Sequence, residues 1–453
     1  MDGLRNSNLH VTLLVGIGIL AAVASTAAVW WQVHMASPDQ VSAGTSLLAR
    51  SKGSIAVLPF RNLSGRREQD YLANGLATDI ISLLSKFSNL MVISSNSSFR
   101  YRNSSMNAEE IGKMLGVQYI LDGSINSVGG RLNIEARLVD TADAQRRWTL
   151  RFEDETGNSL AIRNKLTRKI VSAMAVRITP QDAERSEIGG TKNPAAHDSF
   201  LQGWEHFRRR TAEDMARASA HFKSAIALDA GFARARAALA ATYLVSRIQL
   251  WHKSLGFETK YEAENAARIA LRKAMADPTP LAHRVAARLY SRERRVDEAL
   301  DELERAVALD PNDPQNYALL SITLTWAGRP KEAVDAINAA MRLDPFYPAY
   351  YQSNLGVAKY ALGEFEDAFE HLQRAHRRDG GNILVLSHLL AAEGQLGRLR
   401  NAAVTLNKIN DLRYKKRLRP YSVWEAQHRT LYKNQTDVAR FIDGLKKAKV
   451  PAE

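Results

Sequence analysis

Alanine residues recur at almost constant spacing in the second half of the chain, and this periodicity restricts the possible folds more than any other feature of the sequence. The alanines are Ala299, Ala333, Ala368 and Ala402, separated by 34, 35 and 34 residues. Aliphatic residues keep the same steps at Leu303, Ile337, Leu372 and Leu406, and glycines recur at Gly328, Gly363 and Gly397. A period of this length holds two helices that cross closely at small residues and are joined by a short turn. We therefore expect stacked helical pairs, each packed on its neighbours.

The period, the small residues at the helix crossing and the prolines at the unit ends (Pro311, Pro345) resemble the tetratricopeptide repeat. The pattern predicts repeats over residues 193–413, as helical pairs near 196–229, 232–278, 280–313, 314–347, 348–382 and 383–413. The second pair carries an insertion around 249–261. Residues 414–453 are expected to form a helical cap, with helices over 421–432 and 436–447, because a solenoid needs its open end covered.

The resemblance implies that partners bind in a concave groove made by the first helix of each pair. Arg284, Arg288 and Arg292 are four residues apart and share one helical face, which favours a protein or peptide partner of acidic character. The other residues expected to line the groove are Gln315, Trp326, Tyr350, Ser353 and Tyr360. The alternative is a solvated arginine face, partly paired with Glu298 or Glu302, with Trp326 in the core.

Residues 11–31 carry no charged side chain and end in Trp30 and Trp31. At about 1.5 Å per residue, a helix of this length spans roughly the 30 Å core of a bilayer. The segment predicts a single membrane-spanning helix within residues 1–35, and a cleaved signal peptide stays open as the alternative. Arg5 precedes the helix, whereas the next Lys or Arg residues are Arg50 and Lys52, so we expect an inner-membrane protein with its soluble domains in the periplasm.

A polar linker at 36–52 leads into a small α/β domain predicted over 53–185. Strands are expected at 54–60 and 91–94, followed by a hairpin of alternating apolar residues at 119–125 and 132–138 and a third strand at 148–152. Apolar residues at helical spacing predict helices over 72–87, 108–115 and 160–178. The fold class is thus multidomain: a transmembrane helix, an α/β domain and an all-α solenoid.

Several strings of this domain resemble the TolB-like amino-terminal domain of bacterial membrane-anchored multidomain proteins. They are SIAVLPFRNLSG (54–65), YLANGLATDII (71–81), VISSNSSFRY (92–101), LGVQYILDGSI (115–125) and RLNIEARLVD (131–140). In that family the domain commonly follows an adenylate/guanylate cyclase or winged-helix domain and precedes tetratricopeptide repeats. Only ten residues precede Val11 here, so no cyclase activity is expected of this chain.

Two polar segments of the α/β domain are candidates for ligand binding. Residues 62–65 (Asn-Leu-Ser-Gly) are typical of a turn and are interpreted as one. Asn96, Ser97 and Ser98, with Arg100 and Arg102, could hold an anion through hydroxyl and guanidinium groups, but a solvated loop is the favoured interpretation.

No catalytic, cofactor or metal site is expected. The chain has no cysteine, and it lacks the phosphate-binding Gly-x-x-x-x-Gly-Lys, His-Glu-x-x-His and Gly-x-Ser-x-Gly patterns. His371 and His376, near Glu370, are five residues apart on a helix and therefore do not lie well on one face. We interpret them as surface residues of the repeats. The basic tract 413–419 and the net charge of +14 could attract anions, but no nucleic-acid fold accompanies them, so nucleic-acid binding is not expected.

Two functions remain. The first is a non-catalytic, membrane-anchored scaffold or sensor of the bacterial envelope that binds partners in the repeat groove. The second is a detached sensory subunit of a cyclase-type signalling system, from which the cyclase domain itself is absent. Homo-oligomer formation stays open.

Overall fold

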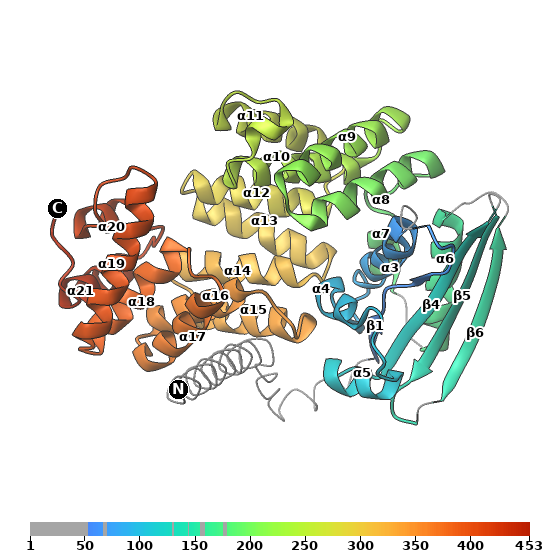
Figure 1. Cartoon of the computed structure of the whole chain (residues 1–453), viewed down its shortest axis with the longest axis horizontal. Helices are drawn as coiled ribbons and strands as arrows, with labels where there is room; N and C mark the ends of the chain where they lie inside the picture. Colours follow the sequence, from blue (N-terminus) through green and yellow to red (C-terminus); the bar gives the residue numbers. More distant parts are fainter. Residues whose placement is uncertain (1–52, 67–69, 129–130, 144, 155–158, 175–178) are drawn as a thin grey trace, which may run out of the picture. The chain divides into compact units, whose positions relative to one another are not determined.

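The computed structural model describes residues 53–66, 70–128, 131–143, 145–154, 159–174 and 179–453. A small mixed α/β domain comes first and is followed by a long array of helical pairs (Figure 1). The expected membrane helix at 11–31 and the linker at 36–52 lie outside the described residues. Within these ranges, no helix is both long and apolar enough to cross a membrane.

The sheet of the α/β domain has the strand order β3-β1-β4-β5-β6, with β2 paired to β4. The strands are β1 (Gly53–Val57), β2 (Arg61–Asn62), β3 (Leu90–Val92), β4 (Tyr119–Val128), β5 (Arg131–Asp140) and β6 (Arg146–Asp154). β1 runs parallel to both β3 and β4, whereas β4, β5 and β6 are antiparallel. The hairpin and third strand predicted from the alternating apolar residues are confirmed.

The helices of this domain are α3 (Asp70–Leu84), α4 (Ser95–Ser98), η2 (Phe99–Tyr101), α5 (Ala108–Leu115), α6 (Ser159–Ala173) and α7 (Pro180–Glu187). α5 begins with a reciprocal capping box between Asn107 and Glu110 and ends at Gly116 in a left-handed conformation (φ 67°), as its sequence favours. The short helices α4 and η2 replace the expected loop, and α7 was not predicted.

β1 is buried on both faces, as a central parallel strand requires. Ile55 and Val57 belong to the core that contains α3 and α6 residues, whereas Ala56 and Leu58 belong to the core that contains α5 residues. The continuous apolar run at the start of the domain therefore reflects its place inside the sheet.

The helical array confirms the repeats. Its pairs are α8 (Pro194–Arg209) with α9 (Ala212–Leu228), α10 (Ala233–Ile248) with α11 (Lys260–Ala274), α12 (Pro280–Arg292) with α13 (Val296–Leu309), α14 (Pro314–Trp326) with α15 (Pro330–Leu343), α16 (Ala349–Leu362) with α17 (Phe365–Arg378), and α18 (Ile383–Gln395) with α19 (Leu399–Lys415). The insertion in the second pair contains the short helix η3 (His252–Leu255), and α20 (Val423–Arg429) and α21 (Gln435–Lys447) follow the last pair. The four alanines that define the period are fully buried.

Candidate functional site

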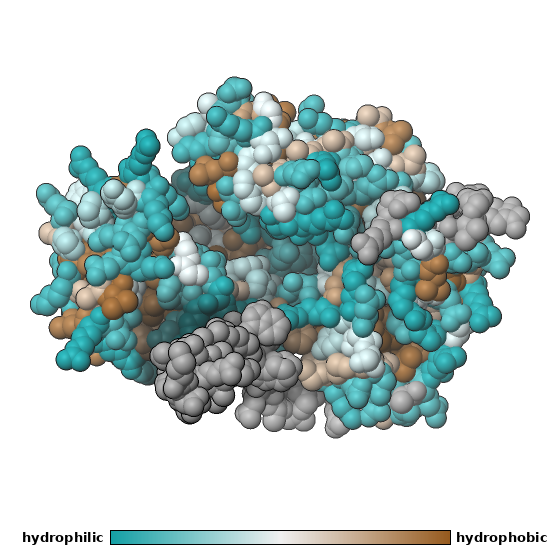
Figure 2. All heavy atoms as spheres, in the orientation of Figure 1, coloured by the Kyte–Doolittle hydropathy of each residue, from teal (hydrophilic) through white to brown (hydrophobic). Residues whose placement is uncertain are grey.

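The inner face of the repeats is the surface made by the first helix of each pair. First helices of neighbouring pairs contact one another, as α10 does with α12 and α14 with α16. Side chains from successive repeats therefore lie on one surface, which is the geometry expected for partner binding. Figure 2 shows that hydrophilic residues cover much of the recessed middle of the face seen there.

Arg284 is not a free cation of this surface, which corrects the expectation from sequence. Its side chain is buried, its guanidinium pairs with Asp313, and it donates a hydrogen bond of 2.8 Å to the amide oxygen of Asn316. Burial alone would lower the pKa of Arg284, but Asp313 raises it above its ordinary value. Arg284 thus links α12 to the start of the next repeat.

The other two arginines of α12 are more accessible. Arg288 is exposed, whereas Arg292 is about one-third exposed and its Nη2 lies 3.5 Å from Oε2 of Glu264. Glu298 and Glu302, the partners considered from sequence, pair with other cations instead. Arg288 is therefore the member of the predicted trio whose charge is available on the inner face.

The remaining predicted groove residues divide by exposure. Gln315 is exposed and Tyr350 is 39% exposed, so both can contact a partner. Ser353 is 2% exposed and lies in the packing of α16.

Trp326 and Tyr360 belong to the contact with the C-terminal helices. Tyr360 is fully buried, packs edge-to-face on Phe441 of α21 and donates a hydrogen bond of 2.9 Å to the carbonyl oxygen of Arg440. Trp326 is partly buried against the same core, and its carbonyl oxygen accepts a hydrogen bond of 2.8 Å from the Lys433 amide. For Trp326 the alternative core interpretation describes the structure better, and Tyr360 is covered by the chain itself.

The C-terminal segment follows the edge of the array where first helices turn into second helices. Lys433 pairs with Asp297 at 2.6 Å, and Arg440 donates a hydrogen bond of 2.6 Å to the carbonyl oxygen of Ala361. Asn434 lies against the turn glycine Gly328. The cap thus reaches back over several repeats and occupies one edge of the array.

The α/β domain occupies the opposite edge, where one repeat turns into the next. Asn312 inserts between the two units: its amide donates to the carbonyl oxygens of Ser85 (2.9 Å) and Phe87 (3.1 Å), and its oxygen accepts from the Val92 amide (3.3 Å). One turn earlier, Asp277 accepts a hydrogen bond of 3.2 Å from the Gly189 amide. Repeat turns that the sequence marked only as unit ends therefore dock the α/β domain.

The segment around Asn96 and Ser97, considered from sequence as an anion site, binds a carboxylate of the chain itself, that of Asp344 in the repeats. Its carboxylate accepts hydrogen bonds from the hydroxyls of Ser94 (2.8 Å) and Ser97 and from the amide of Asn96 (3.0 Å). Ser97 and Ser98 are fully buried, so the expected solvated loop is a docking helix. The anion was not foreseeable because it comes from residues about 250 positions away.

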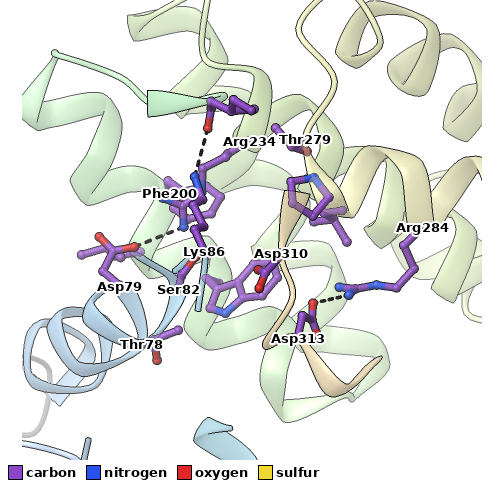
Figure 3. A pocket seen from close by; sticks show the side chains of 15 residues that line it. Thr78, Asp79, Ser82, Lys86, Phe200, Arg234, Thr279, Arg284, Asp310 and Asp313 are labelled. Atoms are coloured by element: carbon purple, nitrogen blue, oxygen red, sulfur yellow. Dashed lines mark hydrogen bonds and ion pairs between the residues drawn. The ribbon is translucent and has the colours of Figure 1, made fainter. Parts of the chain in front are cut away.

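A cavity of about 110 Å³ lies between α3, the middle of α8 and the starts of α10, α12 and α14 (Figure 3). Its charged lining residues are Asp79, Lys86, Arg234, Arg284, Asp310 and Asp313. Burial lowers the pKa of Lys86 and raises the pKa of Asp310, because each charged form loses water. The nearby His197 and Arg234 outweigh the effect of burial on Asp79 and hold its pKa well below its usual range. These charges balance one another, as in a polar domain contact.

The histidines considered as metal ligands do not form a site. Nδ1 of His371 lies 2.6 Å from the amide oxygen of Gln352. In the part of the chain that the structure describes, no three His, Asp or Glu side chains are placed to hold a metal ion.

Comparison with known proteins identifies two segments. Residues 290–355 match the tetratricopeptide repeat family, and residues 51–172 match the second domain of HilA/YgeH-like transcriptional regulators. The chain is 30% identical over 299 residues to the protein named putative adenylate cyclase 3 of Rhizobium meliloti (strain 1021), which is 66% of this chain and 45% of that protein. The chain therefore spans less than half of that relative.

Among solved structures, PilF and TolB resemble parts of the chain. PilF of Pseudomonas aeruginosa is 17% identical with a TM-score of 0.34, over 55% of this chain and 96% of that one. TolB of Acinetobacter baumannii is 16% identical with a TM-score of 0.22, over 27% of this chain and 28% of that one.

Proposed function

We propose that this chain is a non-catalytic interaction protein that binds a partner polypeptide on the inner face of its repeats. The observation that carries the proposal is the set of accessible side chains on successive first helices: Arg288 of α12, Gln315 of α14 and Tyr350 of α16. Described segments of the chain occupy both edges of the array, whereas these three side chains of the inner face stay accessible to a partner.

The proposal includes a membrane anchor formed by residues 11–31, with the α/β domain and the repeats in the periplasm. Its basis is the uncharged segment ending in Trp30 and Trp31, together with Arg5 before it. The TolB-like character of residues 53–185 is proposed on the five strings given above. An alkaline phosphatase fused after Glu453 should be active, and an active cytoplasmic reporter at the same position would overturn this topology.

Site-specific photo-crosslinking in membranes tests partner binding. A photo-reactive residue at Gln315 should capture a discrete partner, whereas the same residue at exposed Ala403, on the second helix of the last pair, should not. Equal capture at both positions, or none at Gln315, would contradict binding on the inner face.

A second candidate is a sensory subunit of a cyclase-type signalling system. The match to a protein named as a putative adenylate cyclase favours it, since the chain corresponds to 45% of that protein. Capture at Gln315 of a polypeptide with a cyclase domain would support this function, and capture only of unrelated envelope proteins would favour the scaffold.

A further inference from the structure

Two charged side chains that line the cavity beside α3, Lys86 and Asp310, form no ion pair with any residue that the structure describes (Figure 3). The other four charged lining residues form two ion pairs, Asp79 with Arg234 at 3.2 Å and Arg284 with Asp313. The cavity is therefore left with one positive and one negative group, the first from the α/β domain and the second from the repeats.

Both side chains are more than nine-tenths buried, since Lys86 is 6% exposed and Asp310 is 8% exposed. The Lys86 ammonium group has three N–H donors. Among the described residues, its hydrogen bonds go to the carbonyl oxygens of Ser186 (3.4 Å) and Ile188 (3.5 Å), and both distances are long for an N–H···O bond. A buried charge with so few partners costs free energy unless another group pairs with it.

The Asp310 carboxylate also has unused hydrogen-bonding capacity. It accepts a hydrogen bond of 3.4 Å from the backbone amide of Asn312. The Ser85 hydroxyl lies beside it but donates its hydrogen to the carbonyl oxygen of Ser82 at 3.0 Å. Because a carboxylate can accept about four hydrogen bonds, Asp310 can accept more from a group in the cavity.

The docking of the α/β domain holds these two side chains in place. The side-chain amide of Asn312 donates to the carbonyl oxygens of Ser85 and Phe87, the residues on either side of Lys86. Asp310 lies two residues before Asn312 in the same turn of the repeats. One contact therefore positions both charges, and the site exists before anything binds.

The size and the charges of the cavity limit the class of ligand. A water molecule needs roughly 10–15 Å³ of such space, so about 110 Å³ admits a molecule of roughly six to eight non-hydrogen atoms. A simple anion would pair with Lys86 but be repelled by Asp310, and a simple cation would meet the opposite problem. Apolar side chains complete part of the lining, namely Phe200, Leu201, Trp204 and Leu281. The cavity therefore favours a small molecule with one charge of each sign.

We infer that this cavity binds a small zwitterion, an α-amino acid with a short side chain, whose carboxylate pairs with Lys86 and whose ammonium group pairs with Asp310. Charge-assisted hydrogen bonds of this kind are stronger than neutral ones, and they gain further strength where water is partly excluded. The bound amino acid joins the α/β domain to the repeats. The inference goes beyond the proposed function, which requires no small molecule.

Isothermal titration calorimetry of the full chain in detergent micelles tests the inference, with glycine, L-alanine, L-serine and L-valine as probes. At least one of them should bind. The variant Lys86→Met/Asp310→Asn removes both charges at similar side-chain size and should bind that amino acid at least tenfold more weakly. The matched control Lys408→Met/Asp411→Asn makes the same two changes at exposed positions of α19 and should bind within twofold of the unchanged chain.

Isosteres that lack one charge test the same site on the unchanged chain. For alanine they are isobutyrate, in which a methyl group replaces the ammonium group, and alaninamide, in which an amide replaces the carboxylate. Each should bind at least tenfold more weakly than the amino acid. Melting curves show whether the double variants are folded, and the isosteres decide the question even where the variant of the cavity is not.

Three results would overturn the inference. The first is binding of none of the four amino acids, which would show that the cavity holds water alone. The second is equal affinity of the two double variants, and the third is equal affinity of the amino acid and either isostere. All three are measured without a partner polypeptide, so failure here leaves the proposed function standing, whereas loss of capture at Gln315 removes the proposed function and leaves the amino-acid site.

Discussion

Gly394 of α18 and Gly444 of α21 meet where the two helices cross, so closely that a Cβ atom on Gly394 would overlap the carbonyl oxygen of Gly444. A Cβ atom on Gly444 would in turn overlap the hydroxyl of Tyr360 and come within 2.7 Å of the carbonyl oxygen of Ala391. The C-terminal helix is therefore built into the core of the last repeats and covers part of the surface that the repeats would otherwise expose.

Replacing Gly444 with alanine should loosen this crossing. The added methyl group meets backbone and a buried hydroxyl, and such overpacking typically costs about 1–3 kcal/mol. Hydrogen exchange should show faster exchange over residues 435–447 in Gly444→Ala. Gly381→Ala is the control, because an added Cβ there meets nothing within 4 Å. Unchanged protection in Gly444→Ala would show that α21 does not depend on close approach.

Ala333→Trp and Ala368→Trp should each unfold the repeats locally. Both alanines are fully buried at the crossing of paired helices, where a Trp ring has no room. Overpacking of a core position costs about 1–3 kcal/mol for small additions, and the indole adds far more volume. Thermal unfolding followed by circular dichroism should show a lower Tm for both variants. Ala403→Trp, at an exposed position, should melt like the unchanged chain.

The repeats could be predicted from sequence because their period depends on local contacts. Buried alanines and turn glycines must recur wherever two helices of a pair cross, so spacing alone locates them. The groove residues were predicted less well. The repeat register shows on which helix face a side chain lies, but not which other side chain of the protein contacts it. Arg284 and Arg288 share a face in the sequence pattern, yet Asp313 of the next repeat neutralises the first and leaves the second exposed.

The contacts between the α/β domain and the repeats could not be predicted from one sequence. Asn312 and Asp344 look like ordinary turn residues of a repeat, and their partners at Val92 and Ser97 lie more than 200 positions earlier. Tyr360 was misassigned for the same reason, since α21 returns from the end of the chain to cover it. Such long-range contacts have no periodic signal.

Arg284→Gln should destabilise the chain, whereas Arg288→Gln should not. The first change removes the cation paired with Asp313 in a largely buried position, for which we expect a loss of about 1–3 kcal/mol. The second change affects an exposed side chain without an ion pair, where substitutions usually stay within about 0.5 kcal/mol. Urea denaturation compares the two directly. Equal stability of both variants would show that the pair with Asp313 does not stabilise the fold and that Arg284 is available to a partner in the groove.

Asn312→Ala should weaken the docking of the α/β domain. The change leaves the carbonyl oxygen of Ser85 and the amide of Val92 without the partner that Asn312 supplies, and the carbonyl oxygen of Phe87 keeps only the Leu90 amide as a donor. Each unsatisfied buried group costs about 1–3 kcal/mol, so the two units should begin to melt separately. Calorimetry should resolve two transitions in place of one. Asn338→Ala, at an exposed position of α15, should keep the original transition.

Glu393→Gln should make stability less sensitive to pH. Glu393 is 3% exposed, and burial raises its pKa to about 7 although Thr405 and Arg398 act in the opposite direction. The ordinary pKa of an unfolded glutamate is about 4.3. Because the folded state binds the proton more tightly, the contribution of Glu393 is complete below that value and is lost as pH rises through about 7. Relative to Glu393→Gln, the unchanged chain should therefore lose about 1–3 kcal/mol of unfolding free energy between pH 4.5 and 8.

Urea denaturation at both pH values measures this difference, with exposed Glu370→Gln as the control. A difference between the unchanged chain and Glu393→Gln that stays constant with pH would show that Glu393 is ionised in the folded protein throughout this range.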